Sequence, residues 1–421
     1  MNFSETRVRI AWFIHRYHPV ISGAENYGRA IVSRFVADGH HADVFTTDAD
    51  DLGYFTDSRK SRVDAPRESL VDGARVTRFP VTHWRGQKYA GRLLSYLPHW
   101  PSQCKYESYM PIIPGIERVR GDYDAVFGVG FPYTLFSYAA WRTAKAARAP
   151  LILTPFLHLA TPGDPVNRLY TRPHQGRLLR EADIVVAATN RESLTLADRG
   201  VTQDRVLVMG MGVEHDLVTG GDRSVLRSRL QIPMHSQVVG HLATLHTNKG
   251  TTDLVRAVMV MNASRVDRPV HLILAGMSTP EFESFANALP SGTGRWLHQI
   301  GTLPDDGRPD FYSALDIFAM PSRTDSYGIV FLEAWANGLP VVGAAAGGVV
   351  DVIDDKRDGF LVAFGDVESL AGRLSTLVED PSLADEMGRR GQQKIATGYS
   401  WDDRYRTLRD RVAALPVRRS P

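Results

Sequence analysis

Short apolar runs alternate with amphipathic helical stretches along almost all of the 421-residue chain. The first apolar runs, which are expected to form strands, lie at residues 8–14, 42–47, 124–129, 151–154, 183–188 and 205–209, with helices at 24–37 and 133–148. Strand-then-helix repetition is typical of a parallel sheet covered by helices on both faces. The first 210 residues are therefore predicted to form a doubly wound α/β domain.

A second series of the same kind begins after residue 233. Its expected strands are 238–242, 270–274, 297–300, 317–320, 341–342 and 360–362, and its expected helices are 251–261, 280–288, 306–315, 328–337 and 367–378. Residues 210–233 have no clear apolar period and contain the turn Thr219-Gly220-Gly221, so a linker is predicted there. Two tandem α/β domains, at 1–210 and 211–400, also fit the chain length.

Composition excludes several classes of protein. The single cysteine, Cys104, cannot form an intrachain disulfide or a cysteine-built metal site, and this usage fits a reducing cytoplasm. Arg9 interrupts the first apolar run, which therefore indicates a strand and not a signal peptide. The chain has no run of about 20 apolar residues, so no membrane span is expected. A net charge of +2 argues against a nucleic-acid-binding protein.

The charge is divided unevenly between the two halves of the chain. Residues 1–200 carry 26 basic and 20 acidic residues, a net of +6, whereas residues 201–421 carry 23 and 27, a net of −4. This asymmetry is either ordinary variation or the mark of an anionic partner, such as a lipid surface or a phosphorylated acceptor. Residues 83–97 mix cations with aromatic residues, as an interfacial helix does, although a helix packed on its own domain has the same pattern. Peripheral membrane contact through the N-terminal domain is thus a hypothesis.

The stretch from Met320 to Gly348, MPSRTDSYGIVFLEAWANGLPVVGAAAGG, carries the most chemical information. It predicts a strand end, a polar loop, a helix, a glycine stop, a second strand and a glycine-rich loop. Ser326 is a predicted N-cap of the helix. The first turn would then present the backbone N–H groups of Gly328, Ile329 and Val330, and such a terminus binds phosphate.

Two acidic residues flank this helix start. Asp325 lies in the loop before the helix, and Glu333 lies about two turns further on. They can point into one cleft at different depths, which suits two sets of hydroxyl groups on a sugar nucleotide. Simple capping by Asp325 and a solvated helix face at Glu333 are the alternatives. No G-x-G-x-x-G follows the first strand, which disfavours a nicotinamide-dependent dehydrogenase.

The stretch resembles the E-x7-E motif region of the family 4 retaining glycosyltransferases. Residues at the family's spacing are Pro321-Ser322, Asp325, Gly328, Glu333-Ala334, Gly338 and Pro340-Val341-Val342. Further elements resemble the family in the same order along the chain: the glycine loop from His18 to Glu25, the strand ending at His158, Gly212-Val213-Glu214, Lys249-Gly250 and the terminal helix opening at Ser400-Trp401. This resemblance implies the GT-B fold, two Rossmann-like doubly wound domains that face each other across a cleft.

The resemblance also implies that the two domains bind different substrates. Residues 1–210 would bind the acceptor, residues 211–400 would bind the nucleotide sugar, and a terminal helix within 401–421 would pack back toward the N-terminal domain. The implied catalytic residues are His158, Lys249 and Asp325. The implied donor-binding residues are Gly23, Lys249, Ile300, Asp325, Gly328, Ile329, Val330 and Glu333. The resemblance implies no metal and no cofactor besides the donor itself.

Two positions depart from the family pattern. Asp325 stands where the family has its first glutamate, and Thr244 stands where an arginine usually precedes Lys249 by five residues. Without that arginine, the diphosphate site has no guanidinium group to form two parallel hydrogen bonds with a phosphate. The Lys249 ammonium then remains as a single localised positive charge. His246 and Arg323 are the candidates to compensate.

The predicted function is retaining transfer of a sugar from a nucleoside-diphosphate sugar to a hydroxyl acceptor, without a metal. The acceptor is a glycan, a lipid-linked compound or a small-molecule glycoside. A cytoplasmic location is expected, at the inner membrane face if the N-terminal domain contacts lipid. The alternatives are a GT-B-type sugar-nucleotide epimerase or phosphorylase, and a non-catalytic sugar-nucleotide-binding partner.

Overall fold

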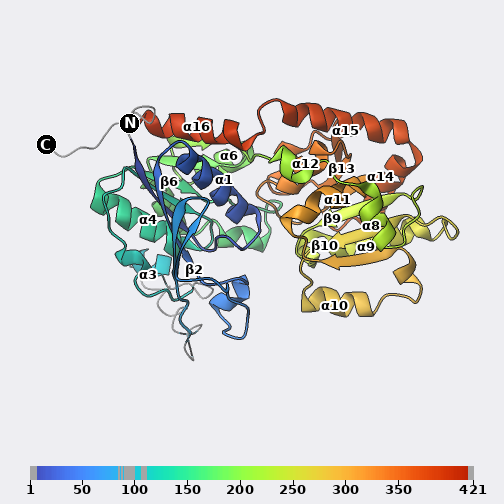
Figure 1. Cartoon of the computed structure of the whole chain (residues 1–421), viewed down its shortest axis with the longest axis horizontal. Coiled ribbons are helices and arrows are strands. Elements are labelled where there is room, and N and C mark those ends of the chain that lie inside the picture. The colour runs from blue at the N-terminus through green and yellow to red at the C-terminus, as the bar shows by residue number, and fades with distance from the viewer. Residues whose placement is uncertain (1–6, 84–85, 87–88, 90–99, 106–110, 416–421) are drawn as a thin grey trace. The chain divides into compact units, whose positions relative to one another are not determined.

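The computed structural model describes residues 7–83, 86, 89, 100–105 and 111–415. The chain divides into two compact units (Figure 1). Unit 1 comprises Met1–Leu157, Pro165–Gly210 and Trp401–Pro421, and unit 2 comprises His158–Asp164 and Met211–Ser400.

Unit 1 contains an eight-stranded sheet in the order β3-β4-β2-β1-β5-β6-β7-β8. The strands are β1 (Arg9–Ile14), β2 (His41–Thr47), β3 (Glu68–Val71), β4 (Ala74–Phe79), β5 (Ala125–Val129), β6 (Leu151–Thr154), β7 (Ile184–Ala187) and β8 (Val206–Val208). Its α-helices are α1 (Gly23–Ala37), α3 (Trp100–Lys105), α4 (Thr134–Ala147), α5 (Pro173–Arg180), α6 (Asn190–Asp198) and α16 (Trp401–Ala413). The predicted parallel strands are confirmed by their pairing. Strands β1, β5 and β6 are buried apolar runs, as expected for a sheet covered on both faces.

The hairpin at one edge of this sheet was not predicted. Strands β3 and β4 pair antiparallel, joined by Asp72-Gly73, whereas every other pair in the sheet is parallel. An Asp-Gly pair between two short runs is a typical hairpin turn. Alternation of exposed and half-buried residues in β3 makes the run too polar to resemble the buried strands.

Unit 2 contains a six-stranded parallel sheet in the order β11-β10-β9-β12-β13-β14. The strands are β9 (Val238–Leu242), β10 (His271–Ala275), β11 (Leu297–Gly301), β12 (Ile317–Met320), β13 (Val341–Ala344) and β14 (Gly359–Val362). Its α-helices are α7 (His215–Val218), α8 (Arg223–Arg229), α9 (Thr251–Asn262), α10 (Pro280–Asn287), α11 (Arg308–Ser313), α12 (Ile329–Ala336), α13 (Val349–Val352), α14 (Val367–Glu379) and α15 (Pro381–Ala396). All six predicted strands are confirmed.

The predicted linker at 210–233 is wrong, because this segment forms α7 and α8 and belongs to unit 2. The Arg227 side chain of α8 is fully buried, donates to the Ala314 carbonyl at 2.9 Å and pairs with Asp316 at 2.9 Å. A buried arginine takes the place of an apolar residue on the inner face of this helix. The hydrophobic periodicity of the sequence therefore does not reveal α8.

The terminal helix α16 packs on α1 within unit 1. Arg34 pairs with Asp402 at 2.6 Å, and the Tyr405 hydroxyl donates to Asp38 at 2.7 Å. The rings of Phe35 and Tyr405 meet edge to face, with their centroids 5.0 Å apart. These contacts anchor α16 along its length.

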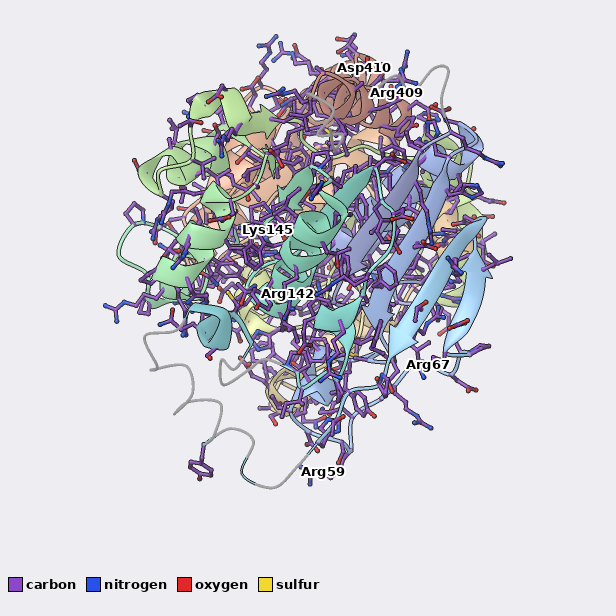
Figure 2. All side chains as sticks on the ribbon, turned by 90° about the vertical axis from the view of Figure 1, so that its left-hand side faces the viewer. Arg59, Arg67, Arg142, Lys145, Arg409 and Asp410 are labelled. Atoms are coloured by element: carbon purple, nitrogen blue, oxygen red, sulfur yellow. The ribbon has the colours of Figure 1, made fainter. Side chains whose placement is uncertain are left out.

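Cationic side chains of unit 1 are spread over several elements. Arg59 and Arg67 lie in the loop before β3, Arg142 and Lys145 lie together on α4, and Arg409 lies on α16 (Figure 2). Most of the proposed interfacial segment, residues 83–97, lies outside the described residues. Within the described part of the chain, no helix is long and apolar enough to cross a membrane.

Candidate donor site in unit 2

The candidate site lies where loops leave the carboxyl ends of three adjacent strands. Strand β9 leads to Lys249, β12 leads to Asp325, and β13 leads to the glycine-rich loop at Gly347. Because the strands are neighbours in a parallel sheet, their loops meet at one edge, where α/β sheets bind ligands.

An ion pair joins the first two loops. The Lys249 Nζ lies 2.8 Å from Oδ2 of Asp325, with side chains 29% and 13% exposed. The other carboxylate oxygen of Asp325 accepts the Tyr327 N–H at 3.2 Å. Burial is the largest influence on Asp325 and opposes its ionisation, but the charge and hydrogen bond of Lys249, the charge interaction with His158 and the Tyr327 N–H together hold the pKa of this carboxyl below its usual value. The Asp325 carboxyl is therefore ionised at neutral pH.

His158 interacts electrostatically with both members of this pair. Burial lowers the pKa of His158 to about 4; Asp325 opposes this shift and Lys249 adds to it. The imidazole is therefore neutral at physiological pH and can donate or accept a hydrogen bond. The structure thus brings together His158, Lys249 and Asp325, the three predicted catalytic residues.

Because Gly347 has no side chain, the backbones of Asp325 and Leu159 can both approach it closely. Its φ is +60°, and an added Cβ would lie 2.3 Å from the Asp325 carbonyl oxygen and 3.0 Å from that of Leu159. The next residue, Gly348, donates its N–H to the Asp325 carbonyl at 2.8 Å. A side chain at 347 would displace the Asp325 loop.

The helix start differs from the prediction. The N-cap of α12 is Gly328, at φ 85°, and not Ser326. Asp325 already accepts the Tyr327 N–H, and the chain then turns at Gly328 into the left-handed region that glycine adopts readily. Ile329 and Val330 are the first two helical residues, whose N–H groups have no acceptor within a helix.

Glu333 lies on α12 and is buried, with 5% of the residue exposed. Its two oxygens accept from Nη1 of Arg308 at 2.6 and 2.8 Å, and Oε2 also accepts from the Tyr312 hydroxyl at 2.6 Å. Sequence reasoning missed Arg308 and Tyr312, although their spacing of four residues places them on one face of a helix. A carboxylate has about four acceptor positions, so Glu333 retains capacity for a ligand hydroxyl.

Removal of the Glu333 carboxylate should separate its structural role from its binding role. Glu333→Leu leaves the Arg308 guanidinium buried without its main partner, so we expect the free energy of unfolding to fall by about 3 kcal/mol. The double variant Arg308→Leu/Glu333→Leu should recover most of that stability. If Glu333 binds the donor, both variants should bind the nucleotide more weakly than the wild type, because both lack the carboxylate. Urea unfolding and titration calorimetry measure the two quantities, and recovered affinity in the double variant would contradict the binding role.

Two further predicted donor residues, Ile300 and Gly23, are carried by other elements. Ile300 is on β11, at the edge of the unit 2 sheet, and β10 separates it from β9. Gly23 is the first residue of α1 in unit 1. Ile300 therefore does not belong to the cluster around Asp325.

Both candidates to compensate for Thr244 have other partners. Thr244 itself is exposed. The His246 ring accepts the Asn248 N–H at 3.0 Å and pairs with Glu281 at 2.9 Å. Arg323 donates to both oxygens of Asp164, each at 2.9 Å. Both side chains are thus engaged by partners within the protein in this structure.

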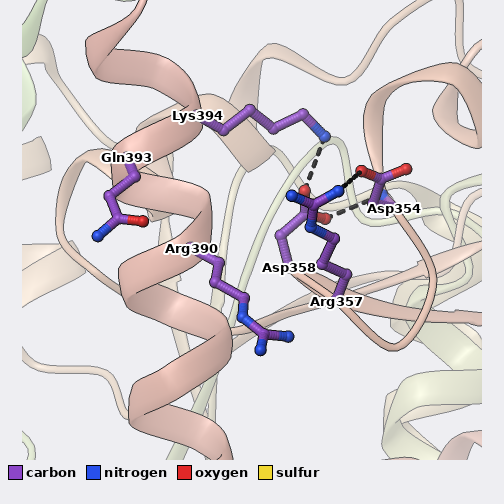
Figure 3. A pocket seen from close by; sticks show the side chains of 6 residues that line it. All are labelled: Asp354, Arg357, Asp358, Arg390, Gln393 and Lys394. Carbon is purple, nitrogen blue, oxygen red and sulfur yellow. Dashed lines mark hydrogen bonds and ion pairs between the residues drawn. The ribbon is translucent and has the colours of Figure 1, made fainter.

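A pocket of unit 2 is lined by residues around β14 and α15 and includes none of the predicted site residues (Figure 3). Lys394 donates to Asp358 at 2.7 Å and lies 4.9 Å from the centre of the Trp335 ring. Asp358 accepts the Asp354 N–H at 2.9 Å. These contacts brace α15 against the segment before β14, which is a structural role.

The loop that carries His158 starts beside a buried carboxylate of unit 1. Glu192 is 2% exposed, and its oxygens accept the N–H groups of Leu157 at 2.8 Å and Ala188 at 2.7 Å. Burial raises the pKa of Glu192 to about 7.

This raised pKa predicts a loss of stability with increasing pH. Between pH 4.5 and 7 folded Glu192 keeps a proton that the unfolded chain releases, so rising pH favours unfolding. Relative to Glu192→Gln, the wild-type free energy of unfolding should fall by up to about 3 kcal/mol across this window. Denaturant unfolding at several pH values measures it. Exposed Glu68→Gln is the control, and a constant difference between wild type and Glu192→Gln would contradict the prediction.

Two family models match the chain. Residues 22–212 match the glycosyl transferase 4-like domain, and residues 222–394 match glycosyl transferases group 1. A D-inositol 3-phosphate glycosyltransferase from Salinispora arenicola is 30% identical over 318 residues, which cover 68% of this chain and 67% of that protein. The chain spans 46% to 68% of the length of Corynebacterium relatives with the same name.

Solved structures share the fold. Sucrose-phosphate synthase from Thermosynechococcus elongatus has a TM-score of 0.76 and 18% identity, over 96% of this chain and 98% of that one. Anabaena HepE in complex with UDP and glucose has a TM-score of 0.70 and 19% identity, over 97% of this chain and 100% of that one. With two Rossmann-like parallel sheets, both family models and these relatives in agreement, the chain belongs to the GT-B glycosyltransferases of family 4.

Proposed function

We propose that the chain transfers a sugar from a nucleoside-diphosphate sugar to a hydroxyl acceptor, with retention of anomeric configuration and without a metal. The observation that carries this proposal is the cluster of Lys249, Asp325 and His158 at the sheet edge, just before the start of α12. The cluster supplies a cation, an anion and a neutral imidazole, and α12 supplies backbone N–H donors.

These groups have separate roles in the proposed reaction. The Lys249 ammonium and the N–H groups of Ile329 and Val330 stabilise negative charge on the departing diphosphate. Asp325 accepts hydrogen bonds from hydroxyl groups of the donor sugar, and neutral His158 contacts the sugar near the reacting carbon. A cation already stands at the leaving group in Lys249, which is why we propose that no metal is needed there.

Retention follows from attack on the face that the diphosphate leaves. The bond between the anomeric carbon and the diphosphate oxygen breaks, and the acceptor oxygen bonds to the same face of that carbon. The acceptor proton passes to the departing phosphate oxygen. This route uses no covalent bond to the protein.

The relatives suggest the first compounds to try. HepE binds UDP and UDP-glucose, so UDP is the first nucleotide. The relatives named D-inositol 3-phosphate glycosyltransferase suggest a phosphorylated polyol as the first acceptor. A lipid-linked acceptor and contact of the N-terminal domain with the inner membrane face are further parts of the proposal, which implies a cytoplasmic location. Flotation with anionic liposomes tests that contact.

A two-step experiment tests the proposed function. Thermal unfolding is first followed with UDP, GDP, ADP and TDP and their common sugar conjugates, in EDTA and in magnesium. We expect one nucleoside diphosphate to raise Tm equally in both. That donor is then incubated with acceptors, and product is measured. Epimerised donor would identify an epimerase, phosphate-dependent cleavage would identify a phosphorylase, and binding without turnover would indicate a non-catalytic partner.

A further inference from the structure

A short segment of the N-terminal half belongs to unit 2. Residues His158–Asp164 are part of unit 2, although their neighbours Leu157 and Pro165 belong to unit 1. We call these seven residues the strap. Ordering a chain segment costs about 1–2 kcal/mol per residue, so the strap needs specific contacts to hold its position.

The end of the strap is held by an ion pair. Nε and Nη2 of Arg323 each donate to one carboxylate oxygen of Asp164, both at 2.9 Å. The Asp164 side chain is 11% exposed and that of Arg323 is 37% exposed. Two parallel bonds between a guanidinium and a carboxylate fix direction as well as distance, more firmly than a single contact does.

Arg323 is itself fixed to the two loops of the candidate site. Its backbone N–H donates to the carbonyl of Asn248 at 2.9 Å, next to Lys249. It also precedes Asp325 by two residues. The residue whose side chain holds the strap therefore lies in the Asp325 loop, and its backbone is hydrogen-bonded to the Lys249 loop.

The start and middle of the strap are also held. Glu192 accepts the N–H of Leu157, the residue before the strap. Leu159 approaches Gly347 so closely that a Cβ there would lie 3.0 Å from its carbonyl oxygen. His158 lies between these two contacts, and the Asp164–Arg323 pair restrains the other end.

We propose that Arg323 is a positioning residue for the transfer reaction: its bidentate pair with Asp164 fastens the strap, and the strap holds the His158 imidazole beside Asp325 and Lys249. This inference rests on the proposed function for its catalytic consequence. Arg323 itself does not contact the reacting atoms in this scheme.

The experiment compares wild type with Asp164→Asn, Arg323→Gln and the double variant, all as the full chain. Hydrogen–deuterium exchange followed by mass spectrometry reports on a peptide covering the strap, and transfer kinetics give kcat and KM. The control is Asp358→Asn, which removes another buried carboxylate paired to a cation in unit 2, away from the strap.

We expect both single variants to speed exchange in the strap about tenfold or more, since charge-assisted hydrogen bonds are lost. The kcat should fall about tenfold, with KM for the donor changed less than about threefold. The double variant should be no worse than either single variant, because the two residues act through one contact. Asp164→Glu should recover part of both the protection and the kcat.

Unchanged strap exchange in Asp164→Asn would overturn the inference, and so would faster exchange with an unchanged kcat. The Asp358→Asn control should leave strap exchange at the wild-type rate, and equal acceleration there would also contradict the inference. Exchange does not depend on turnover. A wild-type chain that transfers no sugar would therefore refute the proposed function while the exchange data still decide whether Arg323 holds the strap.

Discussion

Lys249→Met is expected to lower kcat by about 10²–10³-fold, the effect of removing one preorganised group that stabilises developing negative charge. The reason is that Lys249 is the cation of the cluster in a chain that has Thr244 in place of the usual arginine. Methionine keeps the length of the side chain and removes the charge. The measurement is the initial rate of transfer at saturating donor, together with circular dichroism to verify folding.

The control for this variant is Lys145→Met. Lys145 also pairs with a carboxylate, Glu181 at 3.2 Å, but lies on α4 of unit 1. We expect it to transfer sugar at close to the wild-type rate. A folded Lys249→Met variant with more than half of the wild-type kcat would show that the diphosphate leaves without help from this ammonium.

Asp325→Asn is expected to lower kcat by about 10²-fold while the fold is retained. Lys249 and the Tyr327 N–H bond to different oxygens of Asp325, so the amide oxygen of asparagine keeps one of these two hydrogen bonds. The variant removes the negative charge that faces the sugar hydroxyls and His158. Loss of the charge should also lower the pKa of His158 further, because Asp325 raises it in the wild type. Kinetics and NMR titration of the imidazole measure the two effects.

Asp325→Glu distinguishes charge from length. This variant restores the residue usual in the family and should retain more activity than Asp325→Asn if the charge matters most. The control is Asp253→Asn, whose side chain is similarly buried at 11% exposure and pairs with Arg256 in the same unit. If Asp325→Asn and Asp253→Asn have the same kcat, Asp325 does not contact the sugar in the transition state.

Strand positions could be predicted well from the sequence. The runs at 151–154, 238–242 and 317–320 coincide with β6, β9 and β12, because buried parallel strands are continuous apolar runs. The loops that follow them could then be placed at one edge of a sheet. For this reason the loops of Lys249 and Asp325 could be expected at one edge of the sheet, but their ion pair was not predicted.

The errors arose where polar contacts determine the structure. Helix α8 depends on the buried ion pair of Arg227 with Asp316, which a hydrophobic pattern does not reveal. The N-cap at Gly328 depends on a backbone conformation.

Long-range pairs could not be predicted at all. Arg323 and Asp164 are 159 residues apart in sequence, and Arg308 and Glu333 lie on different helices. Nothing in the composition or spacing of either segment specifies its partner. These pairs depend on how the loops and helices pack, which only the folded structure shows.

Proton NMR of the reaction in EDTA shows directly whether the chain transfers a sugar with retention and without a metal. The purified chain is mixed with the donor that stabilises it and an acceptor, and the anomeric signal of the product is recorded during the first turnovers. We expect a glycoside with the anomeric configuration of the donor, formed at the same rate with and without magnesium. A product of opposite configuration, or no product until a metal is added, would contradict this proposal.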